Sequence, residues 1–145
     1  PVVGNNAQLG KVLGLEMLSQ FGYQNLLAEG VLPEAQSLQE LTHKITHVLE
    51  RAPVVIGRPE QEIKRVAWCT GGAQGYFQEA IDAGVDAYIT GEISESQYHL
   101  ANETGVAFIS AGHHATEKFG VQALAKYIET NHGIGFQFFD EQNPA

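Results

Sequence analysis

Cysteine is almost absent from this sequence, because Cys69 is the only one in 145 residues. A single cysteine cannot form a disulfide within the chain, so the sequence excludes a disulfide-stapled scaffold and favours a reducing compartment; we expect a cytoplasmic protein. Basic residues are also scarce, with 8 Lys and Arg against 17 acidic residues and a net charge of -9. They are scattered along the chain, so direct nucleic-acid binding is not expected, since that needs a basic stripe to displace counterions. No apolar run approaches membrane-spanning length, and we expect no membrane partner.

The size and composition are those of an ordinary globular domain. A chain of 145 residues can bury a real core, and 43% hydrophobic with 17% charged residues gives no sign of disorder. The chain begins with Pro1, and its opening, PVVGNNAQLG, is typical of the entry to a helix that continues an upstream segment. We therefore expect residues 1–145 to be a single domain that forms the carboxyl-terminal portion of a longer protein with two halves.

The first third of the chain predicts two helices separated by short strands. Asn5 and Asn6 are candidate caps for a short amphipathic helix that ends near Gly14. Residues 18–33 contain mixed aromatic and aliphatic residues with two glycines, which indicates one or two strands with turns. Residues 37–40, SLQE, match a capping box, and the apolar stripe that follows predicts a helix to about residue 51.

The rest of the chain alternates between strand and helix patterns. Strands are predicted over residues 63–68, 85–89 and 106–109, each followed by a helical pattern, and the last helix is long. The chain closes on Ile134, Phe136 and Phe138 at period two, which predicts a final edge or antiparallel strand, and Phe136, Phe138 and Phe139 are taken as core residues. The order predicts an α/β fold, with a mainly parallel or mixed sheet flanked by helices.

Three predicted strands end in loops with chemically useful residues. These loops are CTGGAQG (residues 69–75), TGE (residues 90–92) and GHHATE (residues 112–117). Ligands of open α/β sheets bind beyond the carboxyl ends of the strands, so parallel neighbours would bring the three loops to one rim.

His113 and Glu117 are the candidate metal ligands. They are four residues apart at the start of a helix, so both side chains can project from the same side. Imidazole and carboxylate suit zinc, manganese, iron and similar ions, and a carboxylate can bridge two of them. A polar helix start, with Glu117 favoured there by the helix dipole, explains the same residues without a metal. If His113 is a ligand, His114 points elsewhere.

The other two loops suggest further roles. Thr70, Gly71 and Gly72 are candidate substrate-binding residues, because a glycine-rich turn before a helix can hold phosphate, although a tight turn explains it equally well. Glu92 is a candidate catalytic base, or else a group that orients a ligand, or a solvated loop acid. Cys69, at the end of a buried strand, is more often a small core residue than a nucleophile.

The segments VAWCTGGAQGYFQEAIDAGVDAYITGEISE and AGHHATEKFGVQAL, with the terminal NPA, resemble the carboxyl-terminal part of the NIF-three-like family, close to its YbgI-type members, the GTP cyclohydrolase I type 2 homologues. The resemblance implies two intertwined α/β halves with a dinuclear metal site between them, assembled into a toroidal hexamer. It also implies that His113 and Glu117 are metal ligands, with Glu117 contacting both ions. The family's remaining ligands, two adjacent histidines and an aspartate, belong to the amino-terminal half, with the aspartate just upstream of Pro1.

Two functions follow from the residues and the resemblance together. The first is a metal-dependent hydrolase that acts on a nucleotide through two divalent ions. The second is a non-catalytic metal-binding scaffold or regulatory protein that works as a homo-oligomer. In either case, residues 1–145 alone are expected to bind metal weakly, because two ligands supply only part of a coordination shell.

Overall fold

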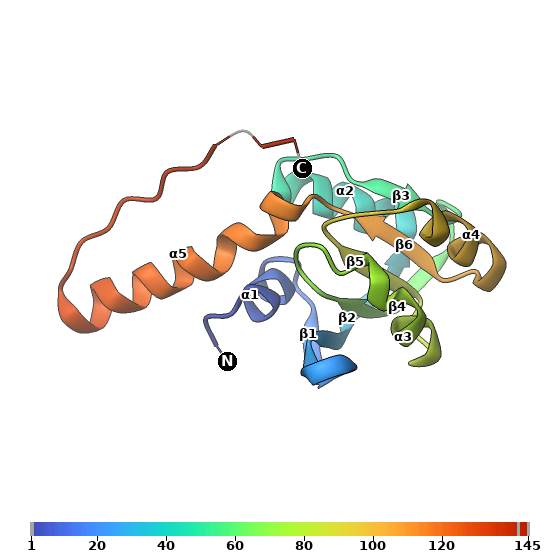
Figure 1. Ribbon diagram of the computed structural model, residues 1–145, viewed down its shortest axis with the longest axis horizontal. Helices are drawn as coiled ribbons and strands as arrows, with labels where there is room; N and C mark the ends of the chain where they lie inside the picture. The colour runs from blue at the N-terminus through green and yellow to red at the C-terminus, as the bar shows by residue number, and fades with distance from the viewer. Residues whose placement is uncertain (1, 142, 145) are drawn as a thin grey trace.

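The structure is a computed structural model that describes residues 2–141, 143 and 144, and its centre is one six-stranded sheet (Figure 1). The strands in chain order are β1 (Glu16–Phe21), β2 (Leu27–Ser37), β3 (Val54–Ile56), β4 (Glu62–Trp68), β5 (Ala87–Thr90) and β6 (Ala107–Ser110). They lie side by side in the order β1-β2-β4-β5-β6-β3. Pro1, Gln142 and Ala145, the last of which ends the NPA motif, lie outside the described residues.

The sheet is mixed, which confirms the predicted α/β class. Strands β4, β5 and β6 are parallel neighbours, because the chain crosses over through a helix between each pair. The pairs β1–β2, β2–β4 and β3–β6 are antiparallel. Only the site-bearing half of the sheet is therefore parallel, and the short edge strand β3 has no counterpart among the predicted strands.

Helices cover both faces of the sheet. They are α1 (Asn5–Val12), α2 (Leu38–Leu49), α3 (Phe77–Asp82), α4 (Glu95–Thr104) and α5 (His113–His132), with 3-10 turns η1 (Tyr23–Asn25) and η2 (Gln74–Tyr76). One core cluster joins the sheet to α1, α2 and the start of α5, and a second joins the opposite face to α3 and α4. Across residues 2–141, 143 and 144, none of the helices has the combination of length and apolar character needed to cross a membrane.

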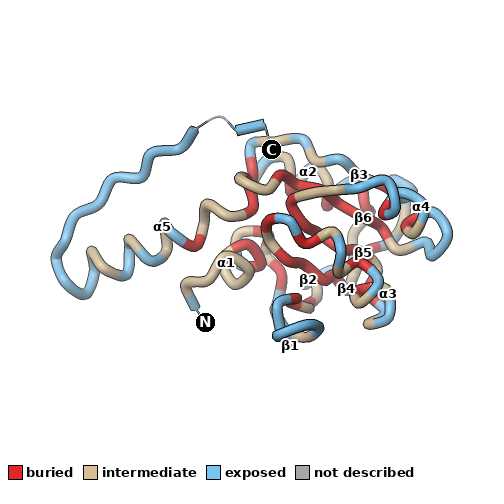
Figure 2. The backbone as a smooth tube through the Cα atoms, viewed as in Figure 1, coloured by how far each residue is buried: buried red, intermediate tan, exposed pale blue. Residues whose placement is uncertain are grey.

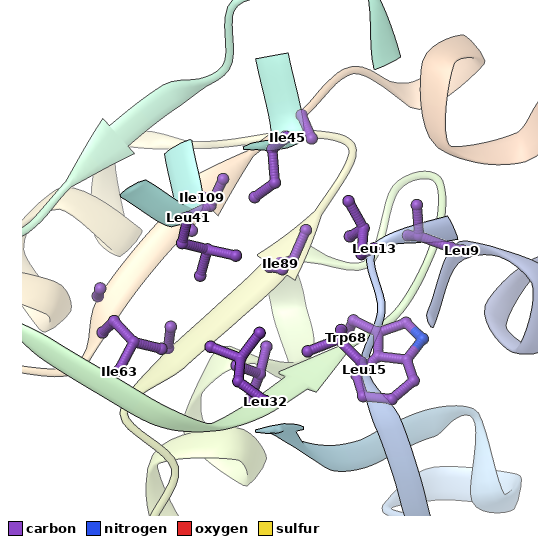
Figure 3. Packing of buried hydrophobic residues seen from close by; sticks show 14 of the residues in the cluster. Leu9, Leu13, Leu15, Leu32, Leu41, Ile45, Ile63, Trp68, Ile89 and Ile109 are labelled. Carbon is purple, nitrogen blue, oxygen red and sulfur yellow. The ribbon is translucent and has the colours of Figure 1, made fainter. Parts of the chain in front are cut away.

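The central strands position the site because they are buried on both faces. All four residues of β5 and of β6 are buried, whereas β1 is exposed along most of its length. Leu41 and Ile45 of α2 pack over Ile89 of β5 and Ile109 of β6 (Figure 3). Each such side chain contributes roughly 1.5–3 kcal/mol when fully buried, so the strand ends that carry the site belong to the rigid part of the molecule.

The two predicted helix starts have different outcomes. The capping box before α2 is confirmed: the Ser37 hydroxyl accepts a hydrogen bond from the amide of Glu40 at 3.2 Å, and the Glu40 carboxylate accepts one from the Ser37 amide at 2.8 Å. The asparagine cap of α1 is wrong, because Gly4 is the cap residue and makes no side-chain hydrogen bond. Asn5 and Asn6 lie inside the helix, and their side chains reach other segments of the chain.

The predicted closing strand is also wrong. Residues 133–140 form no strand, and Phe136, Phe138 and Phe139 are 42%, 36% and 75% exposed rather than buried in the core. The reason is the length of α5, whose 20 residues extend about 30 Å. The final segment therefore starts at the far end of α5, away from the sheet (Figure 1). Figure 2 shows the far half of α5 as a mixture of intermediate and exposed residues, and the described residues of this segment as exposed.

Candidate metal site

The three polar loops meet at one rim of the sheet, as their sequence positions predicted. The amide of Gly91 donates to the carbonyl of Gly71 at 2.8 Å, and the amide of Gly112 donates to the carbonyl of Gly91 at 3.0 Å. The hydroxyl of Thr90 donates to the carbonyl of Gly71 at 3.0 Å, and that of Ser110 to the carbonyl of Gly91 at 2.9 Å. The ends of β4, β5 and β6 are thus joined by backbone and hydroxyl hydrogen bonds into one platform.

Two glycines allow the loops to approach this closely. A Cβ on Gly91 would lie 2.6 Å from the Cα of His113, and one on Gly71 would lie 2.4 Å from the Glu117 carboxylate. Gly71 also has a φ of +70°, which side chains with a Cβ rarely adopt. Gly91 is therefore a steric requirement for the close approach of the His113 backbone, and Gly71 is favoured by its positive φ and by the adjacent Glu117 carboxylate.

His113, Glu117 and Glu92 form a linear chain of side chains on this platform. The Nε2 atom of His113 lies 3.2 Å from Oε2 of Glu117, and its Nδ1 atom lies 2.6 Å from Oε1 of Glu92. All three side chains are about two-fifths exposed. One imidazole thus lies between two carboxylates and is open to solvent on one side.

The electrostatics follow from this order. The hydrogen bond with Glu92, followed by the charges of Glu117 and Glu92, raises the pKa of His113 above its usual range. The same hydrogen bond, with a second from Gln74 at 3.1 Å, lowers the pKa of Glu92. Glu92 is therefore ionised near neutral pH, which suits an acceptor that holds the Nδ1–H of His113 and leaves Nε2 to face Glu117.

The donor set fits part of a divalent metal site. Two ligands that share one transition ion at about 2.0–2.2 Å lie about 3 Å apart, and the Nε2 of His113 and the carboxylate of Glu117 meet that spacing. A carboxylate behind the ligand imidazole is the usual support for such a histidine. Among residues 2–141, 143 and 144, no group of three or more His, Cys, Asp or Glu side chains is arranged to hold an ion. The described residues offer two ligands and a supporting acid.

The glycine-rich loop lies beside these ligands, but its amides are largely engaged. The amide of Thr70 donates to the side chain of Asn6 at 2.8 Å, and that of Gly71 donates to the hydroxyl of Thr116 at 3.0 Å. Gly72 lies against the Glu92 carboxylate. The roles predicted for Thr70, Gly71 and Gly72 in substrate binding remain predictions, and the two engaged amides do not point to a phosphate cradle.

Cys69 and His114 are not grouped with the ligands. Cys69 is buried, and burial raises the pKa of its thiol, which fits the small core residue rather than a nucleophile. The Nε2 of His114 lies 2.7 Å from Oδ1 of Asp140, so this imidazole is paired with the final segment of the chain.

Sequence patterns did not identify the residues that hold the loops in place. Asn6 accepts from Thr70 and donates to the carbonyl of Leu26 at 2.7 Å, so α1 fixes the loop after β4. Thr116 is fully buried and joins the start of α5 to that same loop. The sequence gives one signal for Thr116: it lies one turn into a helix that follows a glycine at the end of a strand.

Known proteins resemble the whole chain. The model of the family described as Duf34/NIF3 (NGG1p interacting factor 3) matches residues 1–144. A "GTP cyclohydrolase 1 type 2 homolog" of Neisseria meningitidis is 62% identical over 145 residues, and one of Pseudomonas aeruginosa is 46% identical over 148 residues. Both alignments cover 100% of this chain but 58% of the relative, so the chain spans little more than half the length of these proteins.

Solved structures agree with the sequence comparison. The protein ybgI, described as of unknown function, superposes with a TM-score of 0.94 at 42% identity, over 100% of this chain and 58% of that one. The protein TTHA1606 of Thermus thermophilus has a TM-score of 0.83 at 28% identity, over 99% of this chain and 57% of that one. The match over residues 1–144 and the shared fold show that this chain belongs to the Duf34/NIF3 family.

Proposed function

We propose that the complete protein is a metal-dependent hydrolase that acts on a nucleotide and that His113 and Glu117 are its metal ligands within this chain. The observation that supports this proposal most directly is the 3.2 Å distance between the His113 Nε2 and the Glu117 carboxylate, at a rim where three strand ends meet. The names of the curated relatives, "GTP cyclohydrolase 1 type 2 homolog", suggest a purine nucleotide as the substrate. A second ion and its ligands are proposed to come from the part of the relatives' length that this chain does not span.

The residues of this chain have separable roles in that proposal. His113 and Glu117 would bind the ion, and Glu92 holds the Nδ1 proton of His113, so that Nε2 is the nitrogen left to bind the ion beside Glu117. Divalent ions at such a site lower the pKa of bound water and polarise the substrate. The geometry favours Glu92 as a positioning residue, because its near oxygen is already committed to His113. A direct catalytic role for Glu92 remains a prediction. Measuring metal affinity can distinguish that catalytic role from the positioning role.

The test is metal content and hydrolysis in the full-length protein. His113→Ala and Glu117→Ala are expected to lower bound zinc, manganese or iron per chain, measured by elemental analysis, and to abolish hydrolysis across a panel of nucleoside triphosphates. His43→Ala is the matched control, because His43 is exposed on α2, away from the rim. Stoichiometric metal in Glu117→Ala, or no hydrolysis of any nucleotide by the metal-loaded wild type, would count against the proposal.

A scaffold function is the second candidate, and one observation favours it. Val121, Leu124 and Tyr127 on the far half of α5 are 56%, 46% and 55% exposed, and their spacing of three residues places them along one face of the helix, as at an interaction surface. We infer that this face contacts another part of the full-length protein or another copy in a homo-oligomer, with the toroidal hexamer and the cytoplasm as the expected assembly and location. If Glu117→Ala loses metal but keeps both the oligomer and the cellular phenotype, the scaffold function is favoured.

A further inference from the structure

The final segment of the chain, residues 133–144, returns to the site after α5 has left it. Figure 1 shows this segment running from the far end of α5 back towards α2 and the start of α5. We call its described residues the C-terminal strap. Helix α5 begins with the candidate ligand His113, so the strap returns to the part of the molecule that carries the candidate metal site.

Two polar anchors hold the strap. The Asp140 carboxylate pairs with His114 at 2.7 Å through one oxygen and with Lys118 at 3.0 Å through the other. The Arg51 guanidinium donates to the carbonyl of Asn143 at 3.2 Å and to that of Pro144 at 2.6 Å. His114 and Lys118 directly follow the two metal-ligand candidates in sequence. The first anchor therefore ties the strap to the same helical turn that carries the ligands.

The strap forms one wall of a pocket whose other wall is the metal site. The α5 side of this pocket of about 340 Å³ includes His113 and Glu117 together with His114, Lys118 and Val121, and the strap side is formed by Phe138, Phe139 and Asn143. Phe136 lies on the same strap but does not line it. Phe138 and Phe139 remain 36% and 75% exposed, so their rings have apolar area that a flat bound molecule could cover.

We propose that Phe138 and Phe139 form a stacking wall for the planar heteroaromatic ring of the substrate, and that the Asp140 anchor fixes this wall relative to His113 and Glu117. The inference rests on the proposed function and names the part of the substrate that this chain recognises. Aromatic faces stack on any nucleobase, since every base has a π-face. The phosphates of the same molecule then face the metal-binding side of the pocket, away from the phenyl rings.

The experiment compares binding of GTP with binding of inorganic triphosphate to the metal-loaded full-length protein. We expect the wild type to bind GTP at least about fivefold more tightly, the low end of what stacking on an aromatic side chain contributes. The double variant Phe138→Ala/Phe139→Ala should lose this preference and keep its triphosphate affinity. Tyrosine at both positions should restore it, and Phe136→Ala is the matched control that should leave it unchanged. Asp140→Ala, which releases the anchor, should lower the preference for GTP over triphosphate.

Three results would overturn the inference. These are equal affinities of the wild type for GTP and triphosphate, a GTP preference that survives in the double alanine variant, and an equal loss of both affinities in that variant. The last result would assign the phenylalanines to the integrity of the metal site or the assembly.

Metal content and hydrolysis, measured on the same samples, test the proposed function separately. A protein without metal whose GTP preference depends on the phenylalanines refutes only the proposed function, whereas a metal-loaded protein that binds GTP independently of them refutes only the stacking wall.

Discussion

Replacing Glu92 tests whether this carboxylate orients His113 for metal binding. Its carboxylate accepts the Nδ1 proton of His113 at 2.6 Å and a hydrogen bond from Gln74 at 3.1 Å. Without the carboxylate, the neutral imidazole can carry its proton on either nitrogen and can rotate. A fraction of the molecules would then present N–H instead of a lone pair towards Glu117, and metal affinity should fall.

The size of the loss should depend on which substitution is made. Loss of a group that orients a metal-ligating histidine commonly costs about 10–100-fold in metal affinity. Glu92→Ala removes both hydrogen bonds and should approach the upper end. Glu92→Gln keeps an oxygen for His113, and the buried Oε1 of Gln74, which has no hydrogen-bond partner in the described structure, can accept from the new amide after a flip. Only the charge is then lost, so the decrease should lie near tenfold.

A competition titration of zinc against a chromogenic chelator, at fixed pH and with the full-length protein, measures both variants. Glu95→Gln is the matched control, because it removes one negative charge from the exposed first turn of α4 and leaves His113 untouched. A Glu92→Ala protein whose zinc affinity is within threefold of the wild type refutes the positioning role. If that protein also loses hydrolysis, Glu92 acts directly in the reaction.

Three further predictions concern the scaffold of the site. Gly91→Ala places a methyl group 2.6 Å from the Cα of His113, so unfolding in urea should show a loss of about 1–3 kcal/mol; unchanged stability would mean that the loops can separate. Leu41→Ala, at a fully buried position, should cost about 2–5 kcal/mol in the same assay, and a smaller loss would show that α2 collapses into the cavity. Hydrogen bonds from the Ser37 backbone and hydroxyl lower the pKa of Glu40 from 4.5, so its contribution to stability should be complete above that value and disappear as the pH falls through the folded-state pKa. The difference in unfolding free energy between wild type and Glu40→Gln, measured from pH 7 to pH 3, should shrink towards low pH; a constant difference would contradict the capping assignment.

Much of the fold was predictable because its signals are local. The capping box at Ser37 and Glu40 and the apolar stripe after it depend on neighbours in sequence, and both are confirmed. The parallel strands β4, β5 and β6 were predictable because each buried run is followed by a helical pattern. The edge strand β3 was not, since three residues carry too little pattern to identify and become a strand only by pairing with β6.

The sequence-based predictions were wrong where one local pattern is compatible with more than one tertiary arrangement. Period-two phenylalanines indicate a strand wherever a partner strand is near, but Phe136 and Phe138 lie on a segment that α5 carries away from the sheet. Asn5 and Asn6 have the chemistry of a helix cap, yet the Asn5 side chain accepts from the amide of Gly120 at 2.8 Å, and that of Asn6 holds the loop at Thr70. Nothing within a few residues of either asparagine encodes these partners.

The sequence by itself determined the candidate ligand pair and its location at the end of a buried strand. His113 and Glu117 are one helical turn apart after a buried strand, and helix geometry alone makes their side chains neighbours. The tertiary structure decided everything that reaches this pair from elsewhere in the chain: Glu92 behind His113, Gly71 beneath Glu117, and Phe138 across the pocket. These contacts join residues about 20 to 46 positions apart in the chain, and their distances depend on how the sheet and α5 pack, which no local pattern records.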